Sequence, residues 1–427
     1  MRVAVFTNQF PSRLSTFFAR DMRALLDAGL ELDIYPIYPL DRALWRFVPA
    51  ELDESVLPRS RIHHVPLRAV LDRADRGGMQ VRSLSAFARD SARASLAAAR
   101  FGVESLSKTG YAALKAWAWT ARAIKPDHVL AYWGNHAATS AYLFHRAAFP
   151  DVPFSMFVHA RMDLYRKPAF LVHKMLHADN VFLVCEFNRR YIAEHYPEAF
   201  SRLAGKLRIH HLGLDLDAVP YTPGARPGYR LVGVGRQETL KGHHVLIDAL
   251  AVLRRKGIGA ELELVGDGPQ HAALRRQAAR LGLGGAVQFS GWLDPDQTME
   301  AIRKATILVH PSVSLDAMPT VLKEALAVGT PVVASRLAGI PEIVDDGRCG
   351  VLVPPGDCAA LADALAMLIA DDDRRRRYAD AGRAHAEKLF DAPRNGRLLA
   401  MRLGETRRRQ RSPTAALNAL PSGVGRD

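Results

Sequence analysis

Strand-like and helix-like segments alternate in regular order through the C-terminal half of the chain, and this alternation limits the possible folds most strongly. Apolar runs separated by amphipathic helices form parallel sheets that are covered on both faces. This half therefore predicts a Rossmann-like α/β domain. The expected strands are Leu231–Val234, Leu262–Val265, Val287–Phe289, Ile307–Val309, Val332–Ala334 and Val351–Val353, and the expected helices are Gly242–Lys256, Gln270–Leu281, Asp296–Lys304, Thr320–Val328 and Ala359–Ala370.

The N-terminal half shows the same alternation less regularly. An insertion at about residues 67–125, rich in Ala, Leu and Arg, is expected to form helices, with Gly77-Gly78 breaking the first. A cluster of Pro and Gly within Leu216–Tyr229 has the composition of a linker. We therefore expect two Rossmann-like domains that face each other across a cleft, residues 1–218 and 219–390, followed by a C-terminal helix and a disordered tail in residues 391–427. The expected N-terminal strands are Val3–Phe6, Leu32–Ile37, His128–Ala131, Phe154–Val158, Val181–Cys185 and Leu207–His211.

Composition favours a cytoplasmic protein with two domains. The chain has 427 residues, of which 48% are hydrophobic, enough to bury at least one full core, and at ~100–200 residues per domain this length predicts two domains. It contains no apolar run of the ~18–20 residues that a membrane-spanning helix needs. Its N-terminus has the pattern of a strand instead of a signal peptide. Cys185, Cys349 and Cys358 form no CxxC pair and have no neighbouring His pair, which argues against disulfides and against a zinc site.

The positive charge is unevenly spread along the chain, with local excesses in residues 59–125 and 371–411. The net charge is +14, and residues 59–125 hold thirteen Lys and Arg against four Asp and Glu. Trp117 and Trp119 lie in the same segment. Basic surfaces with interfacial aromatic residues favour anionic membranes, so we expect a peripheral membrane contact; a solvated helix face is the alternative. A nucleic-acid partner is disfavoured because the sequence contains no recognised nucleic-acid module.

Two segments of the C-terminal half carry groups suited to a diphosphate. Gly233-Val-Gly235-Arg236 and Lys241-Gly242 place glycines and two cations after a strand and before a helix, where backbone N–H groups and positive charge bind phosphates. Further on, Asp316 and Glu324 place two carboxylates across the start of a helix. Gly329-Thr-Pro331 and Ala338-Gly-Ile-Pro-Glu342 follow directly.

These two segments, in this order, resemble the nucleotide-sugar signature of glycosyltransferase family 4, the group 1 glycosyltransferases of the GT-B fold. Cys185-Glu-Phe-Asn188-Arg and Gly213-Leu-Asp215-Leu are further matches, and the loop from Phe10-Pro11 to Phe17 is similar to that of exopolysaccharide and lipopolysaccharide members. The resemblance covers the chain to about residue 390. It implies a retaining transferase that moves a sugar from a UDP- or GDP-linked donor to a lipid-linked or glycan acceptor in surface polysaccharide biosynthesis. The location would be the cytoplasm or the inner face of the cell membrane.

The resemblance also implies roles for single residues. Arg236 and Lys241 would neutralise the leaving diphosphate, Glu324 would bind the ribose hydroxyls, and Asp316 and His159 would face the donor sugar. Asp316-Ala317 stands where family members usually have Glu-Gly. The expected catalytic residues are thus His159, Arg236, Lys241 and Asp316. The expected donor-binding residues are Gly235, Arg236, Lys241, Gly266, Gly268, Trp292, Met318, Thr320, Val321 and Glu324, with Glu342 a weaker candidate.

Neither a metal ion nor a cofactor is expected in this protein, because Arg236, Lys241 and helix N-termini can hold the diphosphate without a cation. Asp215-Leu-Asp217 and Asp294-Pro-Asp296 match the Asp-x-Asp pattern of cation-dependent sugar transferases, but local roles explain both, and Asp294 suits a helix N-cap. Three alternatives to a transferase keep the same fold. They are a nucleotide-sugar 2-epimerase, a phosphorylase, and a non-catalytic basic protein that binds membranes or nucleic acid.

Overall fold

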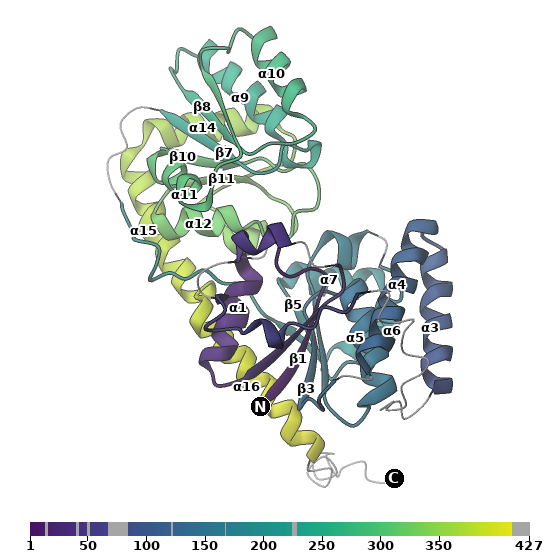
Figure 1. Cartoon of the computed structure of the whole chain (residues 1–427). Coiled ribbons are helices and arrows are strands. Elements are labelled where there is room, and N and C mark those ends of the chain that lie inside the picture. Colours follow the sequence, from purple (N-terminus) through teal and green to yellow (C-terminus); the bar gives the residue numbers. More distant parts are fainter. Residues whose placement is uncertain are drawn as a thin grey trace, which may run out of the picture. The chain divides into compact units, whose positions relative to one another are not determined.

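The chain folds into two compact α/β units (Figure 1). The computed structural model describes residues 1–12, 16–39, 42–48, 52–66, 84–120, 123–166, 168–223 and 229–411. Unit 1 comprises Met1–Val184, Arg189–Leu212 and the chain from Pro393 onward, and unit 2 comprises Cys185–Asn188 and Gly213–Ala392. The expected break at Gly77-Gly78, most of the Pro/Gly-rich part of the linker and the expected disordered tail lie outside the described residues.

Unit 1 is built on a six-stranded parallel sheet in the order β2-β1-β3-β4-β5-β6. All six expected strands are present, and helices pack around the sheet (Figure 1). The strands are β1 Arg2–Thr7, β2 Glu31–Pro36, β3 His128–Ala131, β4 Phe154–Val158, β5 Asn180–Leu183 and β6 Leu207–Ile209. The helical segments are α1 Thr16–Asp27, η1 Arg42–Phe47, η3 Arg59–Arg61, α3 Leu84–Ala99, α4 Val103–Thr120, α5 His136–Ala148, η4 Arg161–Tyr165, α6 Leu171–His177, α7 Glu186–His195, α8 Pro197–Leu203 and α16 Ala392–Arg411; the first three residues of α7 and the first of α16 belong to unit 2.

Unit 2 has a second six-stranded parallel sheet, in the order β12-β11-β10-β7-β8-β9. This is the strand order of a Rossmann fold, in which the order reverses between the first and fourth strands. The reversal here lies between β7 and β10. The strands are β7 Arg230–Val234, β8 Glu261–Val265, β9 Val287–Gly291, β10 Ile307–His310, β11 Val332–Ser335 and β12 Gly350–Val353, and the helices are η5 Thr239–Lys241, α9 His243–Arg255, α10 His271–Arg280, α11 Pro295–Lys304, α12 Thr320–Val328, α13 Ile340–Ile343, α14 Cys358–Ala370 and α15 Asp372–Leu389.

Alternate residues of the unit 2 strands enter two separate hydrophobic clusters. Leu231, Leu262 and Ile307 belong to one cluster, whereas Val232 and Leu308, their neighbours in sequence, belong to the other. Successive side chains of a strand point to opposite faces of its sheet. The sheet is therefore covered on both faces, as its uniformly apolar strands predict.

The insertion contributes the helices α3 and α4, which pack against each other and against α5 (Figure 1). The sequence-based prediction that Trp117 and Trp119 face a membrane is not met by Trp119. Its side chain is buried, and its Nε1–H donates to the carbonyl oxygen of His63 at 2.9 Å. Trp117 is half-buried and packs against Phe87. The reason is helical period, which turns this part of α4 toward the core of unit 1.

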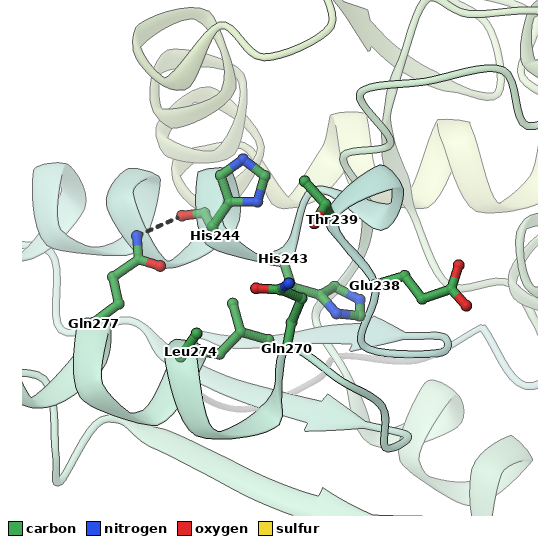
Figure 2. Close-up of a pocket in the computed structure, with 8 residues that line it drawn as sticks. Glu238, Thr239, His243, His244, Gln270, Leu274 and Gln277 are labelled. Atoms are coloured by element: carbon green, nitrogen blue, oxygen red, sulfur yellow. Dashed lines mark hydrogen bonds between the residues drawn. The ribbon is translucent and has the colours of Figure 1, made fainter.

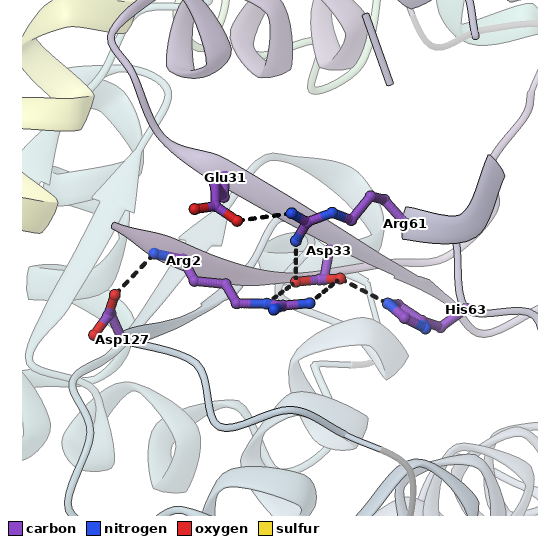
Figure 3. A network of polar contacts seen from close by, with 6 residues as sticks. All are labelled: Arg2, Glu31, Asp33, Arg61, His63 and Asp127. Carbon is purple, nitrogen blue, oxygen red and sulfur yellow. Dashed lines mark hydrogen bonds and ion pairs between the residues drawn. The ribbon is translucent and has the colours of Figure 1, made fainter. Parts of the chain in front are cut away.

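A network of charged side chains surrounds Asp33 on strand β2 (Figure 3). The carboxylate of Asp33 accepts hydrogen bonds from Arg2 Nη2 at 3.1 Å, Arg61 Nη1 at 3.3 Å and His63 Nε2 at 2.8 Å. Its side chain is 4% exposed. Burial acts to raise the pKa of Asp33, but the bonds from His63 and Arg2 outweigh it and lower the pKa from 3.8 to about 2. The ionised carboxylate therefore stabilises unit 1.

We expect this stabilisation to be lost in acid. Because the pKa of Asp33 is lower in the folded state, its contribution is present above about pH 4 and disappears as the pH falls toward 2. The difference between the pKa values of Asp33 in the unfolded and folded states corresponds to roughly 2 kcal/mol of folding stability. Urea denaturation of the wild type and of Asp33→Asn at about pH 6 and about pH 3 measures it. The gap between their free energies of unfolding should narrow at the lower pH, and an unchanged gap would contradict this account.

Candidate active site

The loops that follow β7 and β10 meet at the point where the strand order of unit 2 reverses. Gly242, between η5 and α9, has a φ of +68°, and a Cβ placed on it would lie 1.8 Å from the carbonyl oxygen of Pro311, just after β10. The N–H of Val313 donates to the carbonyl oxygen of Leu240 at 2.8 Å. Ligands of open α/β sheets bind outside the carboxyl ends of strands at this reversal. The fold therefore places the candidate site here.

Lys241 and Asp316 form the centre of this region. Lys241 Nζ lies 2.6 Å from Asp316 Oδ2, and the same oxygen accepts hydrogen bonds from His310 Nε2 at 2.9 Å and Ser312 Oγ at 3.1 Å. The side chains of Lys241 and Asp316 are 21% and 17% exposed. Two residues that are 75 positions apart in sequence, each expected at the donor site, are thus in direct contact. We call Lys241, His310, Ser312 and Asp316 the Lys241–Asp316 cluster.

The carboxylate of Asp316 stays ionised in this setting. Burial acts to raise its pKa, but the hydrogen bond from His310 and the charge of Lys241 hold the pKa well below its usual value. Burial also lowers the pKa of His310, partly offset by Asp316, so the neutral imidazole donates through Nε2–H. The ammonium of Lys241 is therefore held at the sheet edge by a permanent negative charge.

The expected glycines hold the neighbouring loops close together. A Cβ on Gly266 would lie 2.2 Å from the carbonyl oxygen of Gly235, and one on Gly268 would lie 2.6 Å from that of Gln237. The backbone N–H of Gly235 donates to the carbonyl oxygen of Val265 at 3.0 Å, and that of Gln237 donates to the carbonyl oxygen of Asp267 at 2.9 Å. The side chain of Lys241 lies beside Gly235, since its Cδ would be 3.7 Å from a Cβ placed on that glycine. Gly266 and Gly268 thus allow the loops after β7 and β8 to pack closely, and Gly235 has a backbone conformation, with a φ of +153°, that favours glycine.

Helix α12 begins at Thr320, after the N-cap residue Pro319. The first N–H groups of a helix lack partners within that helix, and those of Thr320 and Val321 follow shortly after Asp316 in the chain. Met318 and Val321 pack on the apolar cluster of unit 2. Glu324, one turn further along, is half-buried. The expected residues of this segment therefore lie at the start of one helix, beside the Lys241–Asp316 cluster in sequence.

Arg236 and Trp292 are more exposed than the other expected residues. The side chain of Arg236 is 70% exposed and lies 3.0 Å from Glu238, so the structure does not bring it into the Lys241–Asp316 cluster. Trp292 is 66% exposed and follows β9. Both lie in loops that follow the carboxyl ends of strands, as Lys241 does. Of the two expected cations, Arg236 and Lys241, only Lys241 contacts Asp316 in this structure.

His159, in unit 1, is buried immediately after β4. Its Nε2–H donates to the carbonyl oxygen of Tyr132 at 2.7 Å, and its backbone N–H donates to Asp163 Oδ2 at 3.1 Å. The ring is 4.3 Å from that of Trp133. Burial lowers the pKa of His159, which favours a neutral imidazole. The bond to Tyr132 therefore fixes the orientation of the ring, and Asp163, which also accepts from the N–H of Gly134 at 2.8 Å, fixes the backbone that carries it.

A shallow pocket lies between η5, α9 and α10 (Figure 2). Glu238 and Thr239 form one side, and Gln277 borders the other, where its Nε2–H donates to the carbonyl oxygen of His244 at 3.0 Å. Neither Lys241 nor Asp316 lines this pocket. The Lys241–Asp316 cluster is the candidate site because charged groups converge there, whereas this pocket shares only the η5 segment with it.

Sequence reasoning missed His310 and Ser312. Both flank Pro311 at the end of β10, and the strand pattern could have drawn attention to polar residues at a carboxyl end. Glu342, a weaker candidate, has a clear structural partner: its two carboxylate oxygens accept from the N–H groups of Glu186 and Phe187 at 2.8 and 2.9 Å. Asp294 caps α11 through a capping box with Gln297, as expected, and Asp215 accepts from the N–H of Ala218.

Comparisons with known proteins agree with this architecture. Residues 227–385 match the family model of glycosyl transferases group 1. The chain is 37% identical to a phosphatidyl-myo-inositol mannosyltransferase of Mycobacterium leprae over 45% of its own length and 54% of that protein's. It is 31% identical to a glycogen synthase of Mycobacterium tuberculosis over 64% and 67%. It is 24% identical to the putative colanic acid biosynthesis glycosyltransferase WcaL of Escherichia coli over 86% and 90%.

Solved structures agree on the fold of the whole chain. Anabaena HepE, crystallised in complex with UDP, superposes with a TM-score of 0.64 at 18% identity over 95% of this chain and 99% of that one. A sucrose-phosphate synthase from Thermosynechococcus elongatus has a TM-score of 0.68 at 20% identity over 97% and 100%. These likenesses show a GT-B fold with two Rossmann-like units. The family-model match over residues 227–385 and the 31% identity to the glycogen synthase, 67% of whose length the chain covers, show that the chain belongs to the group 1 glycosyltransferases.

Proposed function

We propose that the protein is a retaining glycosyltransferase that uses a nucleotide diphosphate sugar and needs no metal ion to bind the diphosphate. The observation that supports this most is the position of Lys241. It is held 2.6 Å from Asp316 at the reversal of strand order, close in sequence to the start of α9. A fixed cation beside helix N–H groups suits the negative charge that develops on a departing diphosphate.

The donor would enter by exchanging partners with the cluster. Lys241 would turn part of its hydrogen bonding from Asp316 to a phosphate oxygen. Asp316, with His310 and Ser312 fixing its carboxylate, would then be available to a hydroxyl of the sugar. The N–H groups at the start of α12 would hold another phosphate oxygen, and Glu324 would accept from the ribose. Arg236, on an exposed loop, would close over the diphosphate. UDP in the complex of Anabaena HepE supports a UDP-linked donor, and GDP is the alternative.

The proposal is tested by incubating the purified chain with UDP- or GDP-sugars in EDTA, with and without acceptor glycolipids. Release of nucleoside diphosphate that depends on acceptor, with the anomeric configuration of the donor kept in the product, is expected. Conversion of the donor without acceptor would identify a 2-epimerase instead. A complete requirement for added divalent cation would contradict the proposed role of Lys241.

We further propose a lipid-linked or glycan acceptor of surface polysaccharide biosynthesis, reached at an anionic membrane surface. The names of the mycobacterial mannosyltransferase and of WcaL support this acceptor class.

Exposed apolar side chains on α3 and α4 support the membrane contact. Leu96 and Val103 are 70% and 83% exposed, and Leu114 is 46% exposed; we call these three residues the α3–α4 face. Arg89 and Arg93, on the same helix as Leu96, are exposed as well. Exposed apolar and basic side chains on one helical surface suit anionic headgroups. Among the described residues, no helix combines the length and the apolar character that crossing a bilayer requires.

Co-sedimentation with phosphatidylglycerol vesicles tests this surface. The wild type is expected to bind these vesicles better than phosphatidylcholine vesicles, and binding should weaken as salt is raised. The double variant Leu96→Glu/Val103→Glu should lose most of this binding. Leu281→Glu, at an exposed leucine of unit 2, is the matched control and should bind as the wild type does. Equal binding by all three proteins would exclude the α3–α4 face.

A further inference from the structure

Three side chains with metal-binding atoms lie close together in unit 2, and none of them belongs to the Lys241–Asp316 cluster. They are Asp345, Cys349 and His385, and one ligand atom from each lies within 4.8 Å of the other two. Asp345 and Cys349 belong to the turn between α13 and β12, and His385 comes from α15. All three belong to unit 2. The separation of His385 from the cysteine in sequence explains why spacing rules argued against a zinc site.

The turn that carries two of these ligands has a well-defined backbone. The N–H of Cys349 and that of Arg348 both donate to the carbonyl oxygen of Asp345 at 2.9 Å, and the N–H of Gly347 donates to Gly350 at 2.9 Å. These bonds fix the backbone that carries Asp345 and Cys349. The carboxylate of Asp345 also accepts from Arg348 Nη1 at 3.0 Å, on an exposed side chain. A metal ion would compete with this surface ion pair, which contributes little.

The hydrogen bonding of His385 leaves one ring nitrogen able to bind a metal ion. Its Nε2 lies 3.0 Å from the carbonyl oxygen of Glu342. Because a carbonyl oxygen only accepts, Nε2 carries the proton, and the lone pair that can bind a metal lies on Nδ1. The ring edge also packs against Phe390. A backbone carbonyl that fixes the tautomer of a histidine is a common supporting contact in metal sites.

Cys349 supplies the softest of the three ligands. Its side chain is 1% exposed, it forms no disulfide, and it lies in the apolar cluster with Ile343, Val344 and Phe390. Burial raises the pKa of this thiol. A metal ion would bind the thiolate and release the proton, so its affinity would increase with pH.

We propose that Asp345, Cys349 and His385 bind one divalent ion of the zinc class, with water as the fourth ligand. A sulfur, a nitrogen and a carboxylate oxygen suit Zn²⁺ or Co²⁺ in tetrahedral geometry. Mg²⁺ and Ca²⁺ require oxygen ligands and are excluded by the cysteine. The site is separate from the diphosphate site, and its occupancy is independent of the proposed function.

The ion would connect the α13–β12 turn to α15. Glu342, whose carbonyl oxygen holds His385, also receives the N–H groups of Glu186 and Phe187 on its carboxylate. Binding of the ion would therefore stabilise the segment that holds the start of α7. The expected role is structural, and it is measured without any sugar transfer.

Absorption spectra of the full chain, stripped with EDTA and titrated with Co²⁺, test the proposal. A stoichiometric thiolate-to-cobalt charge-transfer band is expected, which Zn²⁺ displaces. Zn²⁺ should also raise the Tm of the stripped protein, whereas Mg²⁺ should not. Removing a residue that only hydrogen-bonds to a metal ligand typically weakens metal affinity about 10–100-fold. Cys349→Ser and His385→Gln each remove a ligand itself, so each is expected to weaken Zn²⁺ binding by at least that factor.

Matched variants keep the test decisive. Cys358→Ser removes a half-buried cysteine of the same unit that lies outside the cluster, and it should keep the cobalt band. His385→Gln retains an amide that can donate to Glu342, so it reports on the metal if Cys349→Ser fails to fold. Absence of the band in the wild type, or its persistence in folded His385→Gln and Cys349→Ser, would overturn the proposal. If the wild type shows the cobalt band but no sugar transfer, the proposed function is contradicted and the metal site is not.

Discussion

Replacement of Lys241 by alanine is expected to lower the rate of sugar transfer about 10²–10³-fold, the usual cost of removing one preorganised group that stabilises developing charge. Its ammonium is held 2.6 Å from Asp316 at the reversal of strand order, so little reorganisation is needed when a diphosphate departs. Steady-state kinetics with a UDP- or GDP-sugar and an acceptor measure the change. The loss should appear in kcat as well as in kcat/KM, because the charge develops in the transition state.

Lys256→Ala is the matched control for this variant. Lys256 also lies 2.6 Å from an aspartate, Asp363, but that pair is on the surface, with side chains 49% and 69% exposed. The Lys256→Ala variant should keep the wild-type kcat, and its free energy of unfolding should change by no more than a few tenths of a kcal/mol. Arg236→Ala is expected to lower transfer as well, through the same leaving group. Near-wild-type turnover in Lys241→Ala would refute the role of this lysine.

Replacement of Gly242 by alanine is expected to destabilise unit 2 by about 2–5 kcal/mol. The left-handed backbone contributes roughly 1–2 kcal/mol of strain for a residue with a side chain, and overpacking adds about 1–3 kcal/mol. The new Cβ would lie 1.8 Å from the carbonyl oxygen of Pro311, so the loops after β7 and β10 would have to separate. Because Lys241 precedes Gly242, transfer activity should also fall in the fraction that remains folded.

Gly257→Ala separates the two contributions. Gly257 has a similar φ, +79°, but no atom lies within 4 Å of the Cβ position. This variant should therefore show only the backbone strain, about 1–2 kcal/mol, with activity retained. Urea denaturation of both variants measures the difference. Equal destabilisation would show that the contact with Pro311 has no part in holding the site.

The fold was largely predictable because its strands are short, apolar and separated by helices of clear period. All twelve expected strands occur within the described residues, and the two parallel sheets follow from their pattern. Asp294 capped a helix as its position before Pro295 suggested. These features depend on local sequence, which is why composition and period were sufficient to predict them.

The features that sequence reasoning missed depend on long-range contacts. His310 and Ser312 join the site only because β10 lies beside β7. Cys349 meets His385 because α15 packs against the turn before β12. Trp119 was expected at a membrane because its segment is basic, but its position on α4 turns it toward His63. Composition describes a segment as a whole, whereas the burial of one side chain depends on the helix face.

Isothermal titration of wild-type and Lys241→Ala protein with UDP, GDP and ADP tests the central claim most directly. The wild type is expected to bind one nucleoside diphosphate, and Lys241→Ala should bind it about 10–100-fold more weakly, as expected for the loss of one charged hydrogen bond. Binding of the corresponding nucleoside, which lacks phosphates, should be unchanged. Equal diphosphate affinity in the two proteins would contradict the account.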